Sequence, residues 1–429
     1  MTPDLFLLVP EEAAHRMRSG GPWGRLTFRF SEPEQFGAVV AVADGNNTLM
    51  PTPLDPTSHF LRNGIEYKAQ IWYRVAPEVH GYWSYMRKVG KAYTLEGFKD
   101  AVAGGWRNPP AAGCYFALTV SAEAPTRYPD AGIPEIAAWQ VTSGGVFPVD
   151  VDVQAIERGT GQLAPFWPVE KVSTLSVLLV GLGSIGSAAA HALAGYGIGH
   201  LKLLDPDRLL RHNLVRHPGP PKHVGRLKVK VIEEQLAEVR PDTTVEAYDL
   251  DIIVEANRVR PLVDDVDLVL CAADGVAARR VTGHLARKAK KDAILACVLA
   301  DGAFGEIFRL RPWPGHGCLV CRRENLQEEG GMAPEPSLDA GYGTGTTHRP
   351  MTAVGGDLHL VGQLAAKATV ATLLERRGQS DQKLPGEHML IGLRPEAGWA
   401  PPFDFNHSGE IRWLPHTPPR PGCPTCESA

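Results

Sequence analysis

A glycine-rich turn, Gly181-Leu-Gly-Ser-Ile-Gly186, constrains the fold of this chain more than any other feature. The turn directly follows a short apolar run, Leu175–Val180, and opens a segment of helical spacing, Ile185–Tyr196. Glycine lets the backbone approach phosphate oxygens closely, and the first turn of a helix offers N–H groups that have no intrahelical partner. We therefore predict a nucleotide site whose phosphate-facing residues include Gly181, Gly183 and Gly186.

The sequence beyond this turn alternates between short apolar runs and amphipathic helical segments. This alternation is typical of an α/β fold, here a Rossmann-like domain with a mostly parallel sheet and helices on both faces. The predicted strands are Leu201–Leu204, Thr244–Leu250, Asp267–Cys271 and Ala293–Leu299, and the predicted helices are Leu227–Val239, Val276–Lys290 and Asp357–Arg377.

The first 165 residues have a different pattern, with short β-like runs separated by turn clusters and no catalytic signature. We predict two domains: a β-rich accessory domain at residues 1–165 and the α/β domain at residues 166–429. The irregular segment Gly159–Lys171 is expected to join them. The predicted strands of the first domain are Leu26–Phe30, Gly37–Val42, Tyr67–Arg74, Tyr115–Val120 and Ala137–Thr142, and its one predicted helix is Leu95–Ala103.

The charge balance and the apolar runs exclude several classes of partner. The 429 residues contain 44 Lys+Arg against 48 Asp+Glu, a net charge of −4, and no long basic run, which argues against nucleic acid. The longest apolar runs fall far short of the ~18 residues that a membrane helix needs, and the N-terminus lacks the pattern of a signal peptide. Seven cysteines, an odd number, predict a cytoplasmic protein with thiol or metal chemistry.

Four short polar motifs follow the glycine turn and distinguish two kinds of nucleotide site. Asp205 ends the next strand, where a ribose hydroxyl would find an acceptor in a dehydrogenase as well as in an ATP site. Two cations and a later aspartate suit a triphosphate with Mg²⁺ better than a nicotinamide cofactor. Alone, each cation would be interpreted as a solvated surface residue, but the ordered set argues for a site. The motifs are Asp205-Pro-Asp207, Asn213-Leu-Val-Arg216, Gly225-Arg-Leu-Lys228 and Asp274-Gly-Val-Ala-Ala-Arg279.

This ordered set resembles the adenylyltransferase family that includes the ThiF and MoeB proteins and the ubiquitin-activating enzymes. The resemblance covers roughly Leu175–Arg377, about half of the chain, and departs from the family pattern where His217 replaces a Gln and Gly275 an Asn. It implies ATP and Mg²⁺ as ligands. The implied roles are nucleotide binding by Asp205 (at the ribose) and Asp207, phosphate contacts by Asn213, Arg216 and Lys228, Mg²⁺ organisation by Asp274, and catalysis by Arg216, Lys228 and Asp274.

Two C-x-x-C pairs predict a metal site. Cys318 and Cys321 form the first pair, and Cys423 and Cys426 form the second, at the end of the chain. Four thiolates complete a closed tetrahedral Zn²⁺ site, which would pin the C-terminal tail to the segment after the sheet. A redox pair or ordinary free thiols are the alternatives. The family resemblance agrees with zinc, because many members carry such a split site.

Residues 327–356 are rich in Gly, Pro and Thr, which predicts a mobile functional loop. Some relatives in the resembled family form a thioester on a cysteine near this place, but this stretch contains none. Thr346 and Thr347 lie there instead, and a hydroxyl cannot form a thioester. Cys271 and Cys297 are expected to be buried in strands, which leaves Cys114 as the remaining candidate thiol.

The resemblance implies an ATP-dependent adenylyltransferase of the ubiquitin-like-protein activating type. Such an enzyme would adenylate the C-terminal carboxylate of a glycine-tailed ubiquitin-like or sulfur-carrier protein and release pyrophosphate. Residues 1–165 would recognise the carrier or the next enzyme, and a homodimer, a conjugating enzyme and a bacterial ubiquitin-like conjugation operon fit the same family. Adenylation of a ribosomal peptide in natural-product modification, a catalytically silent scaffold and a dehydrogenase remain as alternatives.

Overall fold

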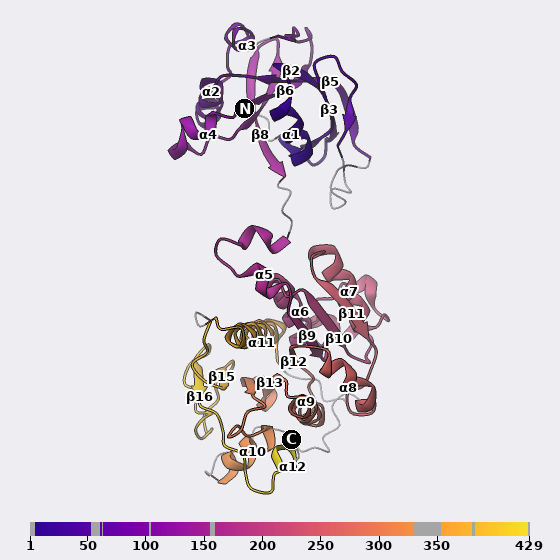
Figure 1. Ribbon diagram of the computed structural model, residues 1–429, viewed down its shortest axis with the longest axis vertical. Coiled ribbons are helices and arrows are strands. Elements are labelled where there is room, and N and C mark those ends of the chain that lie inside the picture. Colours follow the sequence, from indigo (N-terminus) through magenta and orange to yellow (C-terminus); the bar gives the residue numbers. More distant parts are fainter. Residues whose placement is uncertain are drawn as a thin grey trace. The chain divides into compact units, whose positions relative to one another are not determined.

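The computed structural model describes residues 5–52, 61, 63–102, 104–154, 159–328, 353–379 and 382–427. The chain divides into two compact units, Met1–Glu157 and Arg158–Ala429 (Figure 1). The division lies before the segment Gly159–Lys171, which belongs to the second unit. Two contacts hold that segment there: the Trp167 indole N–H donates to the Tyr196 carbonyl at 2.8 Å, and the Thr160 N–H donates to Asp242 at 3.2 Å.

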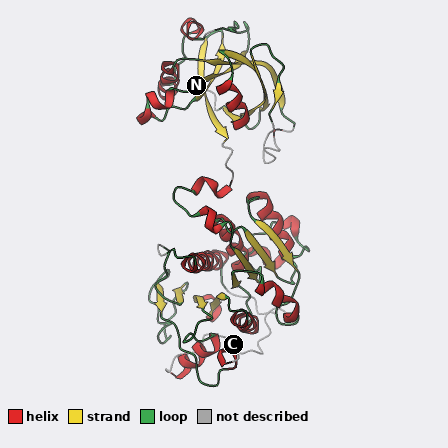
Figure 2. Ribbon diagram, in the orientation of Figure 1, coloured by secondary structure: helices red, strands yellow, loops and turns green. Residues whose placement is uncertain are grey.

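The first unit is built on a sheet that closes on itself. Its strand order is β1-β8-β7-β6-β5-β2-β3-β4, and β1 pairs in parallel with both β8 and β3, so the ends of the sheet meet. The β-rich character predicted for this part is confirmed, whereas its closure into a barrel was not predicted. The strands, drawn in yellow in Figure 2, are β1 (Phe6–Pro10), β2 (Trp23–Ser31), β3 (Phe36–Asp44), β4 (Met50–Pro51), β5 (Ile65–Arg74), β6 (Cys114–Val120), β7 (Ile136–Thr142) and β8 (Gly145–Gln154).

Short helices cover the barrel. α1 buries Ala13, Ala14 and Met17 against the core of the barrel, and α2 buries Val79 and Trp83. The guanidinium of Arg74, on β5, donates to backbone carbonyls at the end of α1, which have no intrahelical donor because the helix stops there. The helices of this unit are α1 (Glu11–Ser19), α2 (Pro77–Val89), α3 (Leu95–Ala101) and α4 (Ala124–Arg127).

The second unit is a mixed sheet in the order β11-β10-β9-β12-β13-β14-β15-β16. Strands β9 to β13 pair in parallel, and β14, β15 and β16 add to the edge in antiparallel fashion. The predicted α/β fold is confirmed. The strands are β9 (Ser176–Val180), β10 (His200–Leu204), β11 (Thr244–Tyr248), β12 (Leu268–Cys271), β13 (Asp292–Leu299), β14 (Phe304–Leu310), β15 (His388–Gly392) and β16 (Ile411–Leu414).

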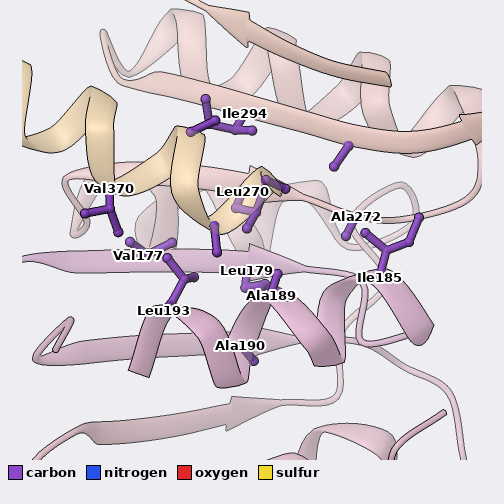
Figure 3. Close-up of a cluster of buried hydrophobic side chains, with 14 of the residues drawn as sticks. Val177, Leu179, Ile185, Ala189, Ala190, Leu193, Leu270, Ala272, Ile294 and Val370 are labelled. Carbon is purple, nitrogen blue, oxygen red and sulfur yellow. The ribbon is translucent and has the colours of Figure 1, made fainter. Parts of the chain in front are cut away.

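Helices pack on both faces of this sheet, because alternate residues of a strand point to opposite faces. Val177 and Leu179 of β9 lie in the cluster formed with α6 and α11 (Figure 3), whereas Leu178 and Val180 lie in the cluster formed with α8 and α9. The helices are α5 (Val169–Val172), α6 (Ser184–Tyr196), α7 (Lys228–Val239), α8 (Ala256–Asp264), α9 (Val276–Lys288), α10 (Leu319–Glu328), α11 (Gly355–Arg376) and α12 (Pro424–Glu427).

Small residues let α6 and α11 approach closely. A Cβ at Gly362 of α11 would lie 2.4 Å from the Ile185 carbonyl oxygen and 2.9 Å from the Ala188 Cβ, so only glycine fits there. This contact fixes the start of α6, the part of the helix that follows the glycine turn. α11 is 22 residues long, yet within the described residues no helix, α11 included, has both the length and the apolar character to cross a bilayer.

Candidate functional site

The three glycines of the turn play different parts in its geometry. Gly181 has φ = +88° and its Cβ would lie 2.7 Å from the Ala273 N, while a Cβ at Gly186 would lie 1.8 Å from the Gly181 O. These two glycines are therefore required by the close packing of the turn itself. A Cβ at Gly183 would meet nothing within 4 Å, so Gly183 faces open space at the first turn of α6. A ligand phosphate can approach the backbone at this position.

Asp205 follows β10, and its carboxylate bonds to the backbone of the glycine turn and to that of Asp207. One carboxylate oxygen accepts from the Leu182 N–H at 2.6 Å, and the other accepts from the Asp207 N–H at 2.8 Å. The residue is 5% exposed, and burial raises the pKa of its carboxyl group, an effect that Lys228 opposes. A carboxylate has about four lone-pair sites, so Asp205 retains acceptor capacity for hydroxyl groups.

Lys228 is the first residue of α7, and carboxylates hold its ammonium group. Its Nζ lies 2.7 Å from an Asp207 oxygen and 4.0 Å from an Asp205 oxygen. The Lys228 side chain is 11% exposed whereas that of Asp207 is 65% exposed. The exposed partner can turn away, which would leave the buried cation available to an incoming phosphate.

The Asn213–Arg216 turn lies against the start of α11. The Asn213 Oδ1 accepts from the Leu210 N–H at 2.9 Å, which shapes the turn. The Arg216 carbonyl accepts from His359 Nε2 of α11 at 2.8 Å, and a Cβ at Gly355 would lie 3.2 Å from the Arg216 Cα. The backbone that carries Arg216 is thus fixed by α11.

Asp274 is exposed in the loop between β12 and α9, and Gly275 is the N-cap of α9. This loop adjoins the glycine turn, because Gly181 packs against the Ala273 backbone. The carboxyl ends of the parallel strands β9, β10 and β12 therefore bring together the glycine turn, the Asp205–Lys228 pair and the Asp274 loop. Open α/β sheets bind ligands at this edge.

Three further residues support this edge and were absent from the predicted set. His217 and Ser187 are buried and bond to the Leu182 carbonyl, and buried Arg279 donates to the Asp274 carbonyl at 3.4 Å. Arg279 and His217 stood within recognised motifs, but their burial depends on contacts with distant segments. Ser187 directly follows the last glycine of the turn, which is the only sequence signal that could have found it.

The four predicted metal ligands lie together in the structure. Their sulfur atoms lie within 4.8 Å of one another, with Sγ–Sγ distances of 3.8 Å for Cys318–Cys321, 3.5 Å for Cys318–Cys423 and 3.7 Å for Cys321–Cys426. A tetrahedral ion with Zn–S bonds of about 2.3 Å separates its sulfurs by about 3.8 Å. The cluster therefore fits a single metal ion of the size of Zn²⁺, held between α10 and α12.

The protonation of the thiols and the hydrogen bond to one sulfur also suit a metal site. Burial raises the pKa of the Cys318 thiol to about 11, so a bound cation is what would deprotonate it near neutral pH. The Arg420 N–H donates to the Cys321 sulfur at 3.3 Å. His316, which precedes the first pair, stacks on His416 with 4.6 Å between ring centroids, and the ligand group found in the described residues contains cysteines alone.

The remaining thiols are poorly placed for catalysis. Cys271 and Cys297 are buried, as predicted, and burial raises the pKa of Cys271. Cys114 is half-buried and accepts from the Gln140 amide at 3.3 Å. Of the predicted loop 327–356, α10 contains Gln327 and Glu328, residues 353 and 354 precede α11, and residues 355 and 356 are its first two residues. Residues 329–352, with Thr346 and Thr347, lie outside the described residues.

The second unit has a Rossmann-like α/β fold with a glycine turn at the carboxyl edge of its sheet, and it carries a four-cysteine cluster. The sequence matches the ThiF family over residues 158–385, which is more than half of the chain, and the chain belongs to this family. The match begins where the second unit begins and ends just before β15.

Several relatives are similar to part of this chain. The ubiquitin-like modifier-activating enzyme 5 of Oryza sativa subsp. japonica is 30% identical over 163 residues, 35% of this chain and 38% of that protein. The sulfur carrier protein ThiS adenylyltransferase of Escherichia coli is 30% identical over 160 residues, 37% of this chain and 62% of that protein. The adenylyltransferase and sulfurtransferase MOCS3 of Anopheles gambiae is 26% identical over 260 residues, 60% of this chain and 51% of that protein.

The chain thus matches less than two thirds of the length of these relatives. Among solved structures, E. coli MccB with AMPCPP and MccA is 19% identical, covering 60% of this chain and 68% of that chain, with a TM-score of 0.44.

Proposed function

We propose that the chain is an ATP-dependent adenylyltransferase that activates the C-terminal carboxylate of a ubiquitin-like or sulfur-carrier protein. The observation that carries this proposal is the meeting of the glycine turn, the Asp205–Lys228 pair and the Asp274 loop at one edge of the second sheet. Membership of the ThiF family supports it, as do relatives named for carrier activation.

Each group at this edge has a role in the proposed reaction. The backbone at Gly183 and the N-terminus of α6 would bind phosphate, and Asp205 would accept from the ribose hydroxyls. Arg216 and Lys228 would neutralise charge on the phosphates, and Asp274 would supply a hard oxygen ligand to Mg²⁺.

The reaction needs no nucleophile from the protein. A carboxylate oxygen of the carrier attacks the α-phosphorus, the bond from that phosphorus to the bridging oxygen breaks, and pyrophosphate leaves. The products are an acyl-adenylate and pyrophosphate. Catalysis would come from positioning of the two substrates and from stabilisation of the charge on the phosphates.

The parts of the chain outside the nucleotide edge would bind the protein partners and stabilise the structure. We assign recognition of the folded carrier or of a conjugating enzyme to the barrel unit, which has its own core. The cysteine cluster would hold Zn²⁺ with no open coordination position, so its role would be structural. We also propose that the chain forms a homodimer through its α/β unit.

A ribosomal peptide is the second candidate substrate, and the thiols favour it. Outside the metal cluster the chain has only Cys114, Cys271 and Cys297, of which two are buried and one is half-buried. Without a reactive thiol, transfer would stop at the acyl-adenylate or pass directly to another acceptor. Peptide modification uses this chemistry without a thioester.

Exchange of labelled pyrophosphate into Mg-ATP tests the proposal and distinguishes the candidates. The full chain is assayed with a panel of glycine-tailed carrier proteins and with peptides that have a free C-terminal carboxylate. Exchange that depends on a folded carrier supports the main proposal, and exchange that depends on a peptide supports the second candidate. Binding of NAD in place of ATP would contradict both.

Asp274→Ala is the informative variant in this assay, because it removes the proposed Mg²⁺ ligand from an exposed position and leaves the fold intact. We expect exchange to fall by about 100-fold or more, since charge stabilisation of the phosphates would be lost. Asp264→Ala, which alters an exposed carboxylate at the end of α8, is the matched control and should exchange like the wild type. Full exchange by Asp274→Ala would mean that Mg²⁺ is held elsewhere.

A further inference from the structure

One buried side chain at the nucleotide edge has no part in the function proposed above. We infer that His217 is a positioning residue of the nucleotide site: its imidazole holds the Leu182 carbonyl and so aims the next peptide N–H, that of Gly183, at the ligand. This inference rests on the proposed function, because it assumes that the glycine turn binds ATP.

Hydrogen bonds define the state of the His217 ring. Nδ1 lies 2.9 Å from the Gly219 N–H, which can only donate, so Nδ1 is the acceptor and the proton is on Nε2. Nε2 lies 3.0 Å from the Leu182 O and 3.0 Å from the Ser187 Oγ. The Ser187 hydroxyl in turn donates to the Leu182 O at 2.9 Å. The imidazole of His217 and the hydroxyl of Ser187 therefore both bond to the Leu182 carbonyl.

The Leu182 residue is held from both sides. Its N–H donates to Asp205 at 2.6 Å, and its carbonyl accepts from His217 and Ser187. In a trans peptide the C=O and the following N–H point in opposite directions. Because the Leu182 carbonyl points inward to His217, the Gly183 N–H points the other way, away from the ring. Gly183 is the N-cap of α6, so this N–H has no intrahelical acceptor and is suited to a phosphate oxygen.

The surroundings keep the ring neutral. His217 is 5% exposed, and burial lowers the pKa of its imidazole to about 4. The charged and titratable groups that face it are Lys228 of α7, His359 of α11 and His191 of α6, and each lowers the pKa further. A neutral ring can donate from Nε2 while it accepts at Nδ1. A glutamine, the residue of the resembled family pattern, can also donate and accept at once.

Calorimetric titration of the full chain with Mg-ATP tests the inference without knowledge of the carrier. His217→Ala leaves the Leu182 carbonyl without its ring partner, and we expect the affinity for Mg-ATP to fall about tenfold or more. His217→Gln should restore the affinity to within about threefold of the wild type. The matched control is His191→Ala, since His191 is a half-buried histidine of α6 whose ring bonds to Gln235 of α7. This variant should bind like the wild type.

Circular dichroism and the melting temperature establish whether each variant is folded. If His217→Ala does not fold, His217→Leu, which fills the space but cannot donate, takes its place with the same expected loss. Folded variants without a donor that bind Mg-ATP like the wild type would overturn the inference and leave the proposed function standing. Failure of the wild type to bind Mg-ATP would overturn both.

Discussion

His80 of α2 is a buried histidine with both ring nitrogens paired. Nδ1 lies 2.9 Å from the Pro134 carbonyl, which can only accept, so Nδ1 carries the proton. Nε2 lies 2.9 Å from the Thr119 Oγ1 and accepts from that hydroxyl. Burial lowers the pKa of the ring to about 4, so folding of the barrel unit requires a neutral His80.

This depressed pKa predicts a dependence of stability on pH. Below pH ~6.5 His80 becomes protonated in the unfolded chain but stays neutral in the folded chain. The free energy of unfolding therefore falls as the pH drops from ~6.5 towards ~4. The loss of stability amounts to about 3 kcal/mol at its limit. Denaturant unfolding between pH 7 and pH 4.5 should show a steeper decline for the wild type than for His80→Gln. Parallel profiles would show that His80 does not titrate in this way.

Residues whose roles follow from local sequence were predictable, and those whose roles follow from distant contacts were not. Gly181 and Gly186 stand in a recognisable turn, and the C-x-x-C spacing indicated the cysteine cluster. Arg74 donates to carbonyls at the end of α1 that lie 54 to 57 positions away along the chain, and His217 bonds to a carbonyl 35 positions away. No local pattern specifies such partners.

At the scale of elements, α10 links the sheet to the C-terminal tail. Arg323 of α10 forms a buried ion pair with Glu306 of β14, and its Nη1 lies 2.7 Å from a Glu306 oxygen. The same helix carries Cys321, whose sulfur lies 3.7 Å from that of Cys426. α12 has four residues, too few to be stable alone, so the tail depends on the cysteine cluster and on the ion pairs of Arg420 with Glu324 and Glu328 of α10.

Replacing one ligand should therefore release the tail. Cys423→Ser is expected to lower the zinc content well below one ion per chain and to increase hydrogen exchange in the segment that ends with α12. Cys114→Ser alters a half-buried thiol outside the cluster and serves as the control. Elemental analysis and hydrogen exchange provide the measurements. One zinc per chain after Cys423→Ser would exclude the four-cysteine site.

Most elements of the parallel half were predictable because apolar runs alternated with helical segments, but α8, which contains Pro261, was missed. The bounds of β9, β10 and α6 differ from the predicted ones by only one residue. β14, β15 and β16 were missed, since β15 and β16 belong to segments far from β14 along the chain. β1 and β8 were missed for a similar reason: their pairing joins the two ends of the first unit.

At the scale of the whole molecule, the sequence predicts the fold and site of the second unit in more detail than those of the first. Each has its own hydrophobic core and its own sheet. The second carries a recognisable edge for a nucleotide, whereas the barrel was predictable only as β-rich. Closure of the barrel depends on the pairing of β1 with both β3 and β8, which alternation along single strands cannot reveal.

The central claim is that the glycine turn of the second unit binds Mg-ATP, and Gly183 offers its most direct test. Gly183→Ala adds a methyl group where the protein leaves open space, so the fold should tolerate it at a cost of about 1 kcal/mol, while an approaching phosphate would collide with it. Gly195→Ala is the matched control at the other end of α6, where a Cβ also meets nothing within 4 Å.

The measurement is the dissociation constant for Mg-ATP of the wild type and both variants. We predict that the wild type and Gly195→Ala bind alike and that Gly183→Ala binds about tenfold or more weakly. A folded Gly183→Ala with the affinity of the wild type would contradict this placement of the nucleotide.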